Sequence, residues 1–418
     1  MALSSASVWE VRPTNGVDTN GGGFVGGAAG TDYSQQNAKN TVGNNISTTD
    51  VVATGVATIT SATASFTSAI VGNIIYLSGS GITTGWYQVV TYTNGTTVIL
   101  DRSPGTGTGA TMNIGGALNT LTQLNTNMAN GHSAWVKAEA TITTATAINF
   151  SFTSNSQSFV AGYTSTRGDG GQVTIQATTT SFTIVQIQNN NNLNTFTLRN
   201  FILDCNSEAN TNGIATQSYG NTLENVTVKN YSSSNAFDIS QGGSQGIVLR
   251  KCLAISGGGT NPVGFKISAN LLGTALIDCQ CLSQAGGTGF LSAGAVMIRC
   301  IAGNFSGTAD GFQLEGDQAP TLLEGCIAYN CGRDGFRFIS NTFSNYGLSI
   351  QNCVAYGNGG YGFNNTLTAI PAGGIYLDYC ATGDNTSGAA TGLTLGPNCV
   401  TLSTDPFAAG TSNNFAPA

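Results

Sequence analysis

The sequence is poor in charge, in histidine and in long apolar runs. Only 8% of its 418 residues are charged, against about 25% in typical soluble domains, so long amphipathic helices with charged outer faces are not expected. The single histidine, His132, excludes a histidine-rich metal site and argues against a Ser-His-Asp triad. No apolar run reaches the ~18 residues of a membrane-spanning helix. The net charge of −7 lacks the basic footprint of nucleic-acid-binding proteins.

The sequence is instead rich in residues that form turns. It contains 57 glycines, and Asn, Thr and Ser are frequent. Glycine and asparagine adopt the left-handed backbone conformation that tight turns need, so the composition favours many short strands joined by turns. The opening stretch MALSSASVWEVRP has neither the basic nor the apolar region of a signal peptide. We therefore expect folding in a cytoplasm.

Two motifs recur through the second half of the chain with the same mean period. The first, apolar-x-x-Cys with some departures, ends at Phe201, Val226, Cys252, Cys279, Cys300, Cys326, Cys353 and Cys380. The second, mostly Gly followed by an aromatic or apolar residue, ends at Ile214, Phe237, Phe265, Phe290, Phe312, Phe336, Phe363 and Leu393. The steps of both motifs lie between 21 and 30 residues. Two independent motifs with one period indicate a repeat structure.

A coil of three short strands fits this repeat, because the composition lacks the helix formers of helical repeats. Cys326 and Ala328 would face inward by the two-residue period of a strand. The corner before the cysteine suits the left-handed conformation at Asn200, Asn225, Asp278, Gly325 and Asn352, whereas Lys251, Arg299 and Tyr379 depart from that rule. Stacked coils give a parallel β-helix with inner columns of Cys and Phe. Neighbouring Cβ atoms ~4.8 Å apart exceed the ~3.5–4.5 Å of a disulfide, so we expect free thiols.

The rest of the chain divides by composition and pattern. Four or five short strands with turns such as Asn94-Gly95 predict a small β domain. Ala117, Leu121, Leu124 and Met128 share one face of a helix that could cover the open first coil. The fold class is thus all-β, a parallel β-helix preceded by a small β domain and a capping helix. We expect an extended arm or attachment segment over residues 1–50, a sandwich or barrel-like domain over 51–116, the β-helix with its helix over 117–402, and a tail over 403–418 that covers the last coil.

The stretch from Cys326 to Phe336, CIAYNCGRDGF, resembles right-handed parallel β-helix proteins of the pectate-lyase-like superfamily. That resemblance covers about half the chain. The stretches VWEVRPTNGVDTNGGGF, VGNIIYLSG, VILDR and AGYTSTRGDGG resemble β-helix proteins encoded by tailed phages, which are generally virion surface components, either tail spikes or capsid decorations, and are often trimeric.

The resemblance implies a structural or surface protein of a phage particle that binds host-surface glycans. Its expected partners are two further copies in a homotrimer, other virion proteins of the capsid or tail, and a host polysaccharide, with no nucleic acid or membrane. The expected location is the virion surface after folding in the host cytoplasm. An enzyme is not the leading expectation. The alternative is a polysaccharide lyase or glycoside hydrolase, a spike depolymerase, acting on the outer face of the β-helix.

Two aspartates are the first candidate catalytic residues. Asp310 and Asp334 both stand two positions before the aromatic of the second motif, so they should stack on adjacent coils about 5 Å apart. Retaining glycosidases hold two carboxyl groups ~5–5.5 Å apart, and close carboxylates also bind Ca²⁺. The alternative is that both cap the turns before Gly311 and Gly335 by accepting local backbone hydrogen bonds.

Lys266, in Gly264-Phe265-Lys266, is the second candidate. One calcium-dependent pectate lyase family has a similar Gly-Phe-Lys with the lysine as base, preceded by an acidic calcium cluster. At the matching place this chain retains only Asp238, with Asp204 as an additional ligand one coil earlier. No cofactor or metal is therefore expected. If calcium binds, its ligands would be Asp204, Asp238, Asp310 and Asp334.

One further motif, Arg167-Gly168-Asp169 in TSTRGDGG, matches an adhesion triplet. In a glycine-rich loop such a triplet is interpreted as a turn.

Overall fold

A computed structural model describes residues 3–36, 47–152, 157–189, 195–217, 219–240, 246–267, 273–315, 320–339, 347–367, 374–410 and 414–417. The chain forms two compact units. Unit 1 comprises Met1–Ile142 and Ser156–Val173, and unit 2 comprises Thr143–Asn155 and Thr174–Ala418. Among the described residues, no helix is long and apolar enough to cross a membrane.

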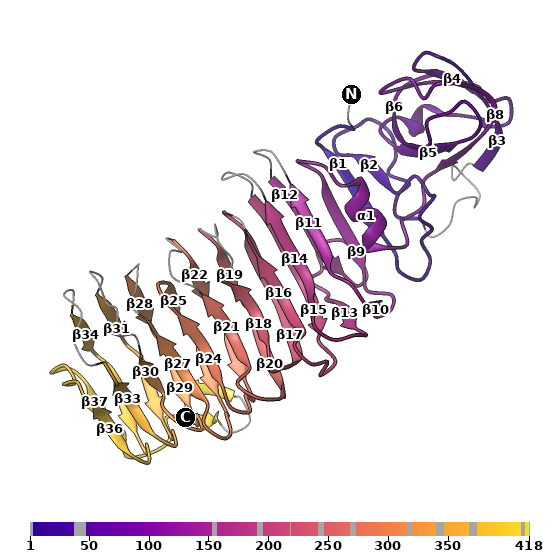
Figure 1. The fold of residues 1–418 in the computed structure, drawn as a ribbon. Helices are drawn as coiled ribbons and strands as arrows, with labels where there is room; N and C mark the ends of the chain where they lie inside the picture. Colours follow the sequence, from indigo (N-terminus) through magenta and orange to yellow (C-terminus); the bar gives the residue numbers. More distant parts are fainter. Residues whose placement is uncertain are drawn as a thin grey trace. The chain divides into compact units, whose positions relative to one another are not determined.

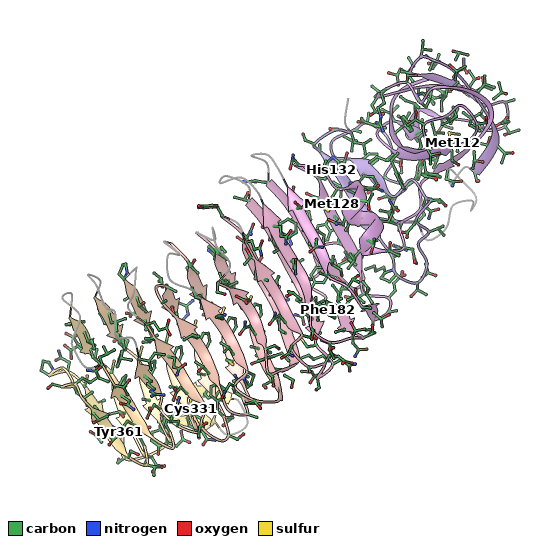
Figure 2. All side chains as sticks on the ribbon, in the orientation of Figure 1. Met112, Met128, His132, Phe182, Cys331 and Tyr361 are labelled. Carbon is green, nitrogen blue, oxygen red and sulfur yellow. The ribbon has the colours of Figure 1, made fainter. Side chains whose placement is uncertain are left out.

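A closed antiparallel barrel forms much of unit 1 (Figure 1). Alternating apolar residues bury one face of each strand, as β7 shows with Val98 and Leu100 inside. Met112 lies in the same core (Figure 2). The strands follow the order β3 (Ser47–Thr54), β4 (Thr58–Thr60), β7 (Thr97–Leu100), β6 (Gly85–Asn94), β5 (Ile74–Ser78) and β8 (Thr106–Ile114). A barrel-like domain was predicted at this place in the sequence.

The segment expected to be an extended arm is folded where the structure describes it. β1 (Ser7–Val11) pairs antiparallel with β2 (Gly23–Val25) and parallel with β9 (Ser133–Lys137), which pairs in turn with β12 (Gln157–Tyr163). Trp9 and Val11 are fully buried, so residues 3–36 are held in unit 1 by apolar burial and are no extended arm. The remainder of the expected arm up to residue 46 lies outside the described residues.

The predicted helix is present as α1 (Leu121–Asn127) in unit 1. Thr120 is its N-cap and accepts a hydrogen bond from the backbone N–H of Gln123 at 3.0 Å, a stabilising arrangement for the free donors of a first turn. Leu121 and Leu124 are buried as the helical pattern predicts. Ala117 is also buried, but it precedes the cap and lies outside the helix.

Unit 2 is a parallel β-helix with three sheets (Figure 1). Sheet 1 contains β19 (Val248–Arg250), β22 (Ala275–Ile277), β25 (Val296–Ile298), β28 (Thr321–Glu324), β31 (Leu348–Gln351) and β34 (Ile375–Asp378). Sheet 2 contains β20 (Leu253–Gly258), β23 (Gln280–Leu282), β26 (Ile301–Gly303), β29 (Ile327–Tyr329), β32 (Val354–Tyr356), β35 (Ala381–Gly383) and β37 (Val400–Thr401).

Sheet 3 contains β11 (Ile148–Phe152), β14 (Thr183–Asn189), β16 (Asn212–Thr216), β18 (Asn235–Ile239), β21 (Val263–Ile267), β24 (Thr288–Ser292), β27 (Asp310–Leu314), β30 (Phe336–Phe338), β33 (Tyr361–Asn365) and β36 (Gly388–Thr391). The longer β15 (Thr195–Asp204) and β17 (Thr222–Ser232) bend at the corner, so that β17 pairs with both β19 and β20. The short strands β10 (Ile142–Thr144) and β13 (Val173–Ala177) fall where the sequence passes between the units.

The Phe column predicted from the second motif is confirmed. Phe237, Phe265, Phe290, Phe312, Phe336 and Phe363 pair in register and are fully buried. Successive ring centroids lie 4.5, 4.7, 4.7, 4.8 and 5.1 Å apart, the offset stacking that aromatic rings favour. The last member was predicted wrongly, because Phe363 pairs with Ala390 and not with Leu393. All ten cysteines are free thiols, as expected.

The corner between sheets 1 and 2 is left-handed in every coil from β15 onward. Its φ angle lies between 51° and 64° at Asn200, Asn225, Lys251, Asp278, Arg299, Gly325, Asn352 and Tyr379. The three residues that depart from the sequence rule thus adopt the same conformation as the five that obey it. The stacking of neighbouring coils imposes the backbone angle, and Lys251, Arg299 and Tyr379 bear the cost of about 1–2 kcal/mol that a Cβ adds there.

The described part of the tail packs against sheet 2, a contact that the sequence did not predict. Phe407 of β38 (Phe407–Ala409) and Phe415 of β39 (Asn414–Pro417) pack edge-on against Tyr329 in sheet 2. The Tyr329 hydroxyl also donates a hydrogen bond to Asp405 at 2.7 Å. The tail therefore buries aromatic surface on the side of the β-helix, which the sequence period does not reveal.

Candidate functional site

The outer face of sheet 3 carries a row of side chains on successive coils, all polar except Leu291. The pairing register aligns Asp238, Lys266, Leu291, Gln313, Arg337 and Asn364. These residues alternate with the buried Phe column, so they lie on the opposite face of the strands. Lys266 and Asp238 belong to this outer row, whereas Asp310 is the first residue of β27 and Asp334 lies in the turn before β30.

Asp310 and Asp334 lie on adjacent coils, as predicted, but both carboxylates are buried and bound. Asp310 is 0% exposed and accepts from Arg333 Nε at 2.6 Å and from its Nη2. Arg337 Nη1 lies 3.5 Å from the same carboxylate, and the backbone N–H of Asp334 donates to it at 3.2 Å. These contacts occupy the carboxylate with two guanidinium groups and a backbone donor.

Asp334 forms hydrogen bonds with the next coil. Its carboxylate accepts the backbone N–H of Tyr361 at 2.8 Å and the side-chain amide of Asn364 at 2.7 Å. Arg337 Nε lies 3.9 Å away, so this arginine stands between the two aspartates. The turn-capping interpretation of Asp334 agrees with these contacts, although the cap joins neighbouring coils and not only the local turn.

Lys266 and Asp238 are neighbours in register on the outer face. Asp238 is nearly buried, and its carboxylate accepts from Asn235 Nδ2 at 3.0 Å and from the backbone N–H of Ser240 at 3.0 Å. Lys266 is half-buried. In the part of the chain that the structure describes, Lys266 is absent from the ion pairs, in contrast to Arg333 and Arg337.

Asp204 is not part of this face. It ends β15 and is bound by Lys229 Nζ at 3.2 Å and Asn230 Nδ2 at 2.8 Å. Burial raises its pKa, but the hydrogen bonds from Asn230 and from the Asn206 backbone, together with Lys229, outweigh burial and lower it. Among the described residues, no group of three or more Asp, Glu, His or Cys could hold a metal ion. The expectation that no metal binds, with Asp204, Asp238, Asp310 and Asp334 as the ligands if calcium does, stays a prediction.

A hollow of about 240 Å³ lies on the outer face next to the Asp310–Arg333 pair. We call it the sheet-3 hollow. Thr288 Oγ1 donates to Gln313 Oε1 at 2.7 Å, which fixes the amide of Gln313 in its wall. The hollow is lined by Asn261, Val263, Gly287, Thr288, Leu291, Thr308, Gln313 and Arg333. Lys266 precedes Leu291 in the outer row.

Sequence reasoning missed Arg333 and Gln313. Arg333 carries a usable signal, because it directly precedes Asp334 in the stretch Cys331-Gly332-Arg333-Asp334. A lone arginine among glycine and asparagine turns in a chain with 13 basic residues indicates an ion pair. Gln313 carries no such signal, since its position is set by register alone.

The Arg-Gly-Asp triplet is structural, which confirms the turn interpretation. Asp169 accepts backbone hydrogen bonds from Thr164, Ser165 and Gly171 of its own loop. Arg167 donates to the buried Glu10 at 2.9 and 2.7 Å through Nε and Nη2. Burial raises the pKa of Glu10, and Arg167 opposes that shift. Both ends of the triplet are therefore engaged within unit 1.

No family model matches the chain, and no curated protein matches its sequence. Solved structures do resemble it. The A-module of the Azotobacter vinelandii mannuronan C-5 epimerase AlgE6 is 16% identical, with a TM-score of 0.40 over 65% of this chain and 89% of that chain. Pectate lyase Pel9A is 14% identical, with a TM-score of 0.45 over 71% and 79%. The catalytic unit of the GH87 α-1,3-glucanase of Streptomyces thermodiastaticus strain HF3-3 is 9% identical, with a TM-score of 0.32 over 90% and 94%.

Proposed function

We propose that this chain is a glycan-binding β-helix protein of a particle surface, and that it holds a polysaccharide along the outer face of sheet 3 without cleaving it. The observation that carries the proposal is the sheet-3 hollow beside two bound carboxylates. Its wall offers the Gln313 amide, the Arg333 guanidinium and the Thr288 hydroxyl, groups that exchange hydrogen bonds with sugar hydroxyls.

The same geometry argues against acid–base chemistry by the two aspartates. A general acid must come within hydrogen-bond reach of the leaving oxygen. Asp310 is fully buried, and its carboxylate oxygens are in contact with Arg333 and Arg337, so they are not presented to a bound glycan. The Asp334 carboxylate accepts a backbone hydrogen bond from the next coil. Asp310 thus holds Arg333 in the wall of the hollow, and Asp334 joins neighbouring coils.

A polysaccharide-cleaving enzyme is the second candidate, and one observation favours it. Lys266 lies beside the hollow, and within the described part of the chain no carboxylate holds it in an ion pair. Its amino group is therefore free to approach a bound sugar, as the base of a lyase would.

A polysaccharide panel separates the two candidates. Binding is measured by affinity electrophoresis and calorimetry, and cleavage by reducing ends and by the absorbance of unsaturated products. We expect at least one polysaccharide to bind without product formation. Gln313→Ala should weaken binding about tenfold or more, whereas Gln351→Ala, on the outer row of sheet 1, should not. Product that disappears in Lys266→Ala would establish the lyase instead. Repeating each assay with EDTA tests the expectation that no metal is needed.

The particle-surface part of the proposal rests on the resemblance of the amino-terminal stretches to tailed-phage proteins. From that resemblance we expect a homotrimer and partners in the capsid or tail. Light scattering of the purified chain measures the first directly, and a monomeric mass at micromolar concentration would contradict it. Labelled antibodies on intact particles test the location.

A further inference from the structure

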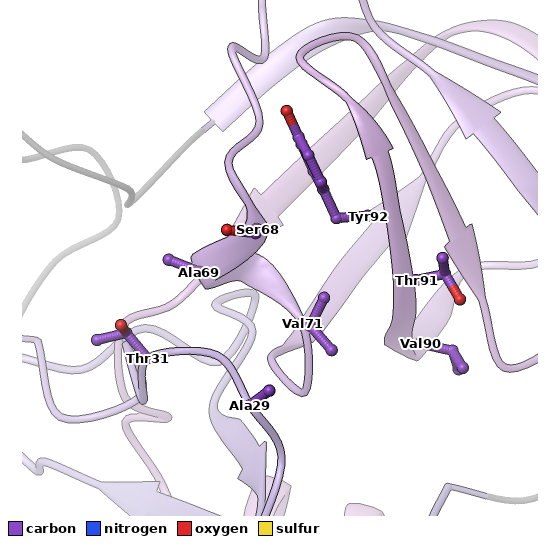
Figure 3. Close-up of a pocket in the computed structure, with 8 residues that line it drawn as sticks. All are labelled: Ala29, Thr31, Ser68, Ala69, Val71, Val90, Thr91 and Tyr92. Carbon is purple, nitrogen blue, oxygen red and sulfur yellow. The ribbon is translucent and has the colours of Figure 1, made fainter.

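A second hollow, of about 530 Å³, lies in unit 1 and is unrelated to the sheet-3 hollow. We call it the barrel hollow. Figure 3 shows the short helix η1 (Ser68–Ile70) and strand β6 around it. Its size falls within the ~300–1,000 Å³ of small-molecule sites. It is lined by Ala29, Thr31, Ser68, Ala69, Val71, Val90, Thr91 and Tyr92.

The lining is uncharged and has two kinds of surface. Thr31, Ser68, Thr91 and Tyr92 bring hydroxyl groups, which both donate and accept hydrogen bonds. The alanines, the valines and the Tyr92 ring bring apolar surface. A carboxylate or phosphate would find no cation in this wall, and the chain's net charge of −7 adds repulsion. The chemistry therefore fits an uncharged ligand with hydroxyls on its edge and C–H groups on its faces.

Val90 and Thr91 lie at an irregularity of β6. The register between β6 and β7 shifts between Val89 and Thr91, and after the fully buried Val89 two successive side chains are exposed, with Val90 46% exposed. Bulges of this kind redirect a side chain and are frequent next to binding sites. An apolar side chain kept in solvent at the mouth of a hollow is a surface that a ligand can cover.

The wall is preformed by backbone hydrogen bonds. Thr31 N–H donates to the Ala69 carbonyl at 2.8 Å, and Gly72 N–H donates to the Val89 carbonyl at 2.8 Å. The buried Asn73 side chain joins the two sides by donating to the Thr31 carbonyl at 2.8 Å and the Ile70 carbonyl at 3.1 Å. The backbone around the hollow is thus already ordered before a ligand binds. Binding therefore costs little conformational entropy.

We propose that the barrel hollow binds a neutral pyranose unit of a glycan. One face of the sugar ring packs on Val90, Val71 and the Tyr92 ring, and its hydroxyls exchange hydrogen bonds with Thr31, Ser68 and Thr91. This site differs from the sheet-3 hollow in unit and in charge, because Arg333 of the sheet-3 hollow has no charged counterpart in the wall of the barrel hollow. It would give the chain a second, independent contact with carbohydrate.

Saturation-transfer NMR on the full chain tests the proposal. The probes are methyl glycosides of glucose, galactose, mannose and N-acetylglucosamine, with methyl glucuronoside as the anionic comparison. We expect transfer to at least one neutral glycoside, with a dissociation constant of roughly millimolar, about −4 kcal/mol, and at least fivefold weaker transfer to the glucuronoside. Absence of transfer to all four neutral probes, or equal transfer to the glucuronoside, overturns the proposal.

A matched pair of valines locates the binding. Val90→Asp should weaken binding at least tenfold, whereas Val56→Asp, at a barrel position 54% exposed and outside the hollow, should leave it unchanged. Tyr92→Ala should also abolish binding, and tryptophan fluorescence verifies that the barrel remains folded. Equal effects of the two aspartates, or full binding by Val90→Asp, would assign the sugar to another place and refute the barrel hollow as its site.

Discussion

Replacing Asp310 by asparagine should destabilise unit 2, because this carboxylate organises two arginines. It is fully buried and takes Arg333 Nε at 2.6 Å, with Arg337 at 3.5 Å. Removing one partner of a buried ion pair costs about 3–5 kcal/mol. The Arg333 side chain is 38% exposed and can recover hydration, so the lower end applies, about 3 kcal/mol.

The two units carry separate reporters for the measurement. All ten cysteines lie between Cys205 and Cys399 in unit 2, and all three tryptophans, Trp9, Trp86 and Trp135, lie in unit 1. Labelling of the buried thiols against urea concentration therefore follows unit 2, while tryptophan fluorescence follows unit 1. Asp310→Asn should shift the thiol transition to lower urea and leave the fluorescence transition in place. Asp384→Asn, at an exposed position, is the control.

A double variant sharpens the test. Asp310→Leu with Arg333→Met removes both partners, and such replacements are often neutral; most of the lost stability should return. An Asp310→Asn protein with an unchanged thiol transition that had lost a glycan-cleaving activity of the parent would refute this reasoning. It would return Asp310 to a catalytic role.

Three further outcomes are expected. Tyr379→Gly should stabilise unit 2 by up to about 1 kcal/mol, since Tyr379 has φ 56° and glycine removes the Cβ penalty at some entropic cost; an earlier thiol transition would contradict this. Phe312→Ala should lower the stability of unit 2 by about 3–5 kcal/mol. Phe363→Ala should cost about 1 kcal/mol less, because Phe363 stacks on one neighbouring ring and Phe312 on two. Equal shifts of the two thiol transitions would contradict a stabilising contribution from ring stacking. His132 Nδ1 accepts from Trp9 Nε1 at 3.1 Å, and burial lowers the pKa of His132. Its folded pKa thus lies below its unfolded value near 6.5, so its stabilisation is present above pH 6.5 and lost as the pH falls below that value. The melting temperature of unit 1 should therefore drop between pH 7.5 and 5.5 more steeply than in His132→Gln.

The sequence predicts those parts of the fold that repeat. The Phe column and the free thiols follow from a period shared by two motifs. The tail could not be placed, because nothing periodic says that Phe407 packs on Tyr329. Leu393 was misassigned because Gly392-Leu393 imitates the motif three residues after the true partner of Phe363. At this coil the sequence motif and the backbone pairing point to different residues, and the pairing determines which residue continues the column.

The candidate site was predicted only in part. Stacking of Asp310 above Asp334 follows from the period, but the partners of Asp310 do not. Arg333 belongs to the turn of the following coil, 23 residues later, and a side chain from a turn reaches in a direction that no strand pattern specifies. The hollow beside it depends on the sizes of residues from four successive coils together, so it is visible only once the coils are stacked.

The regular spacing of the last cysteines has a consequence for evolution. Cys326, Cys353 and Cys380 stand 27 residues apart, and the strands that follow them pair without a shift of register. One coil can therefore be duplicated or removed as a unit, and its neighbours meet the same backbone and the same inner side chains as before. The length of the β-helix is a heritable quantity that changes in whole coils. A lineage could thereby alter how far the protein reaches while the surface on either side of the change stays intact.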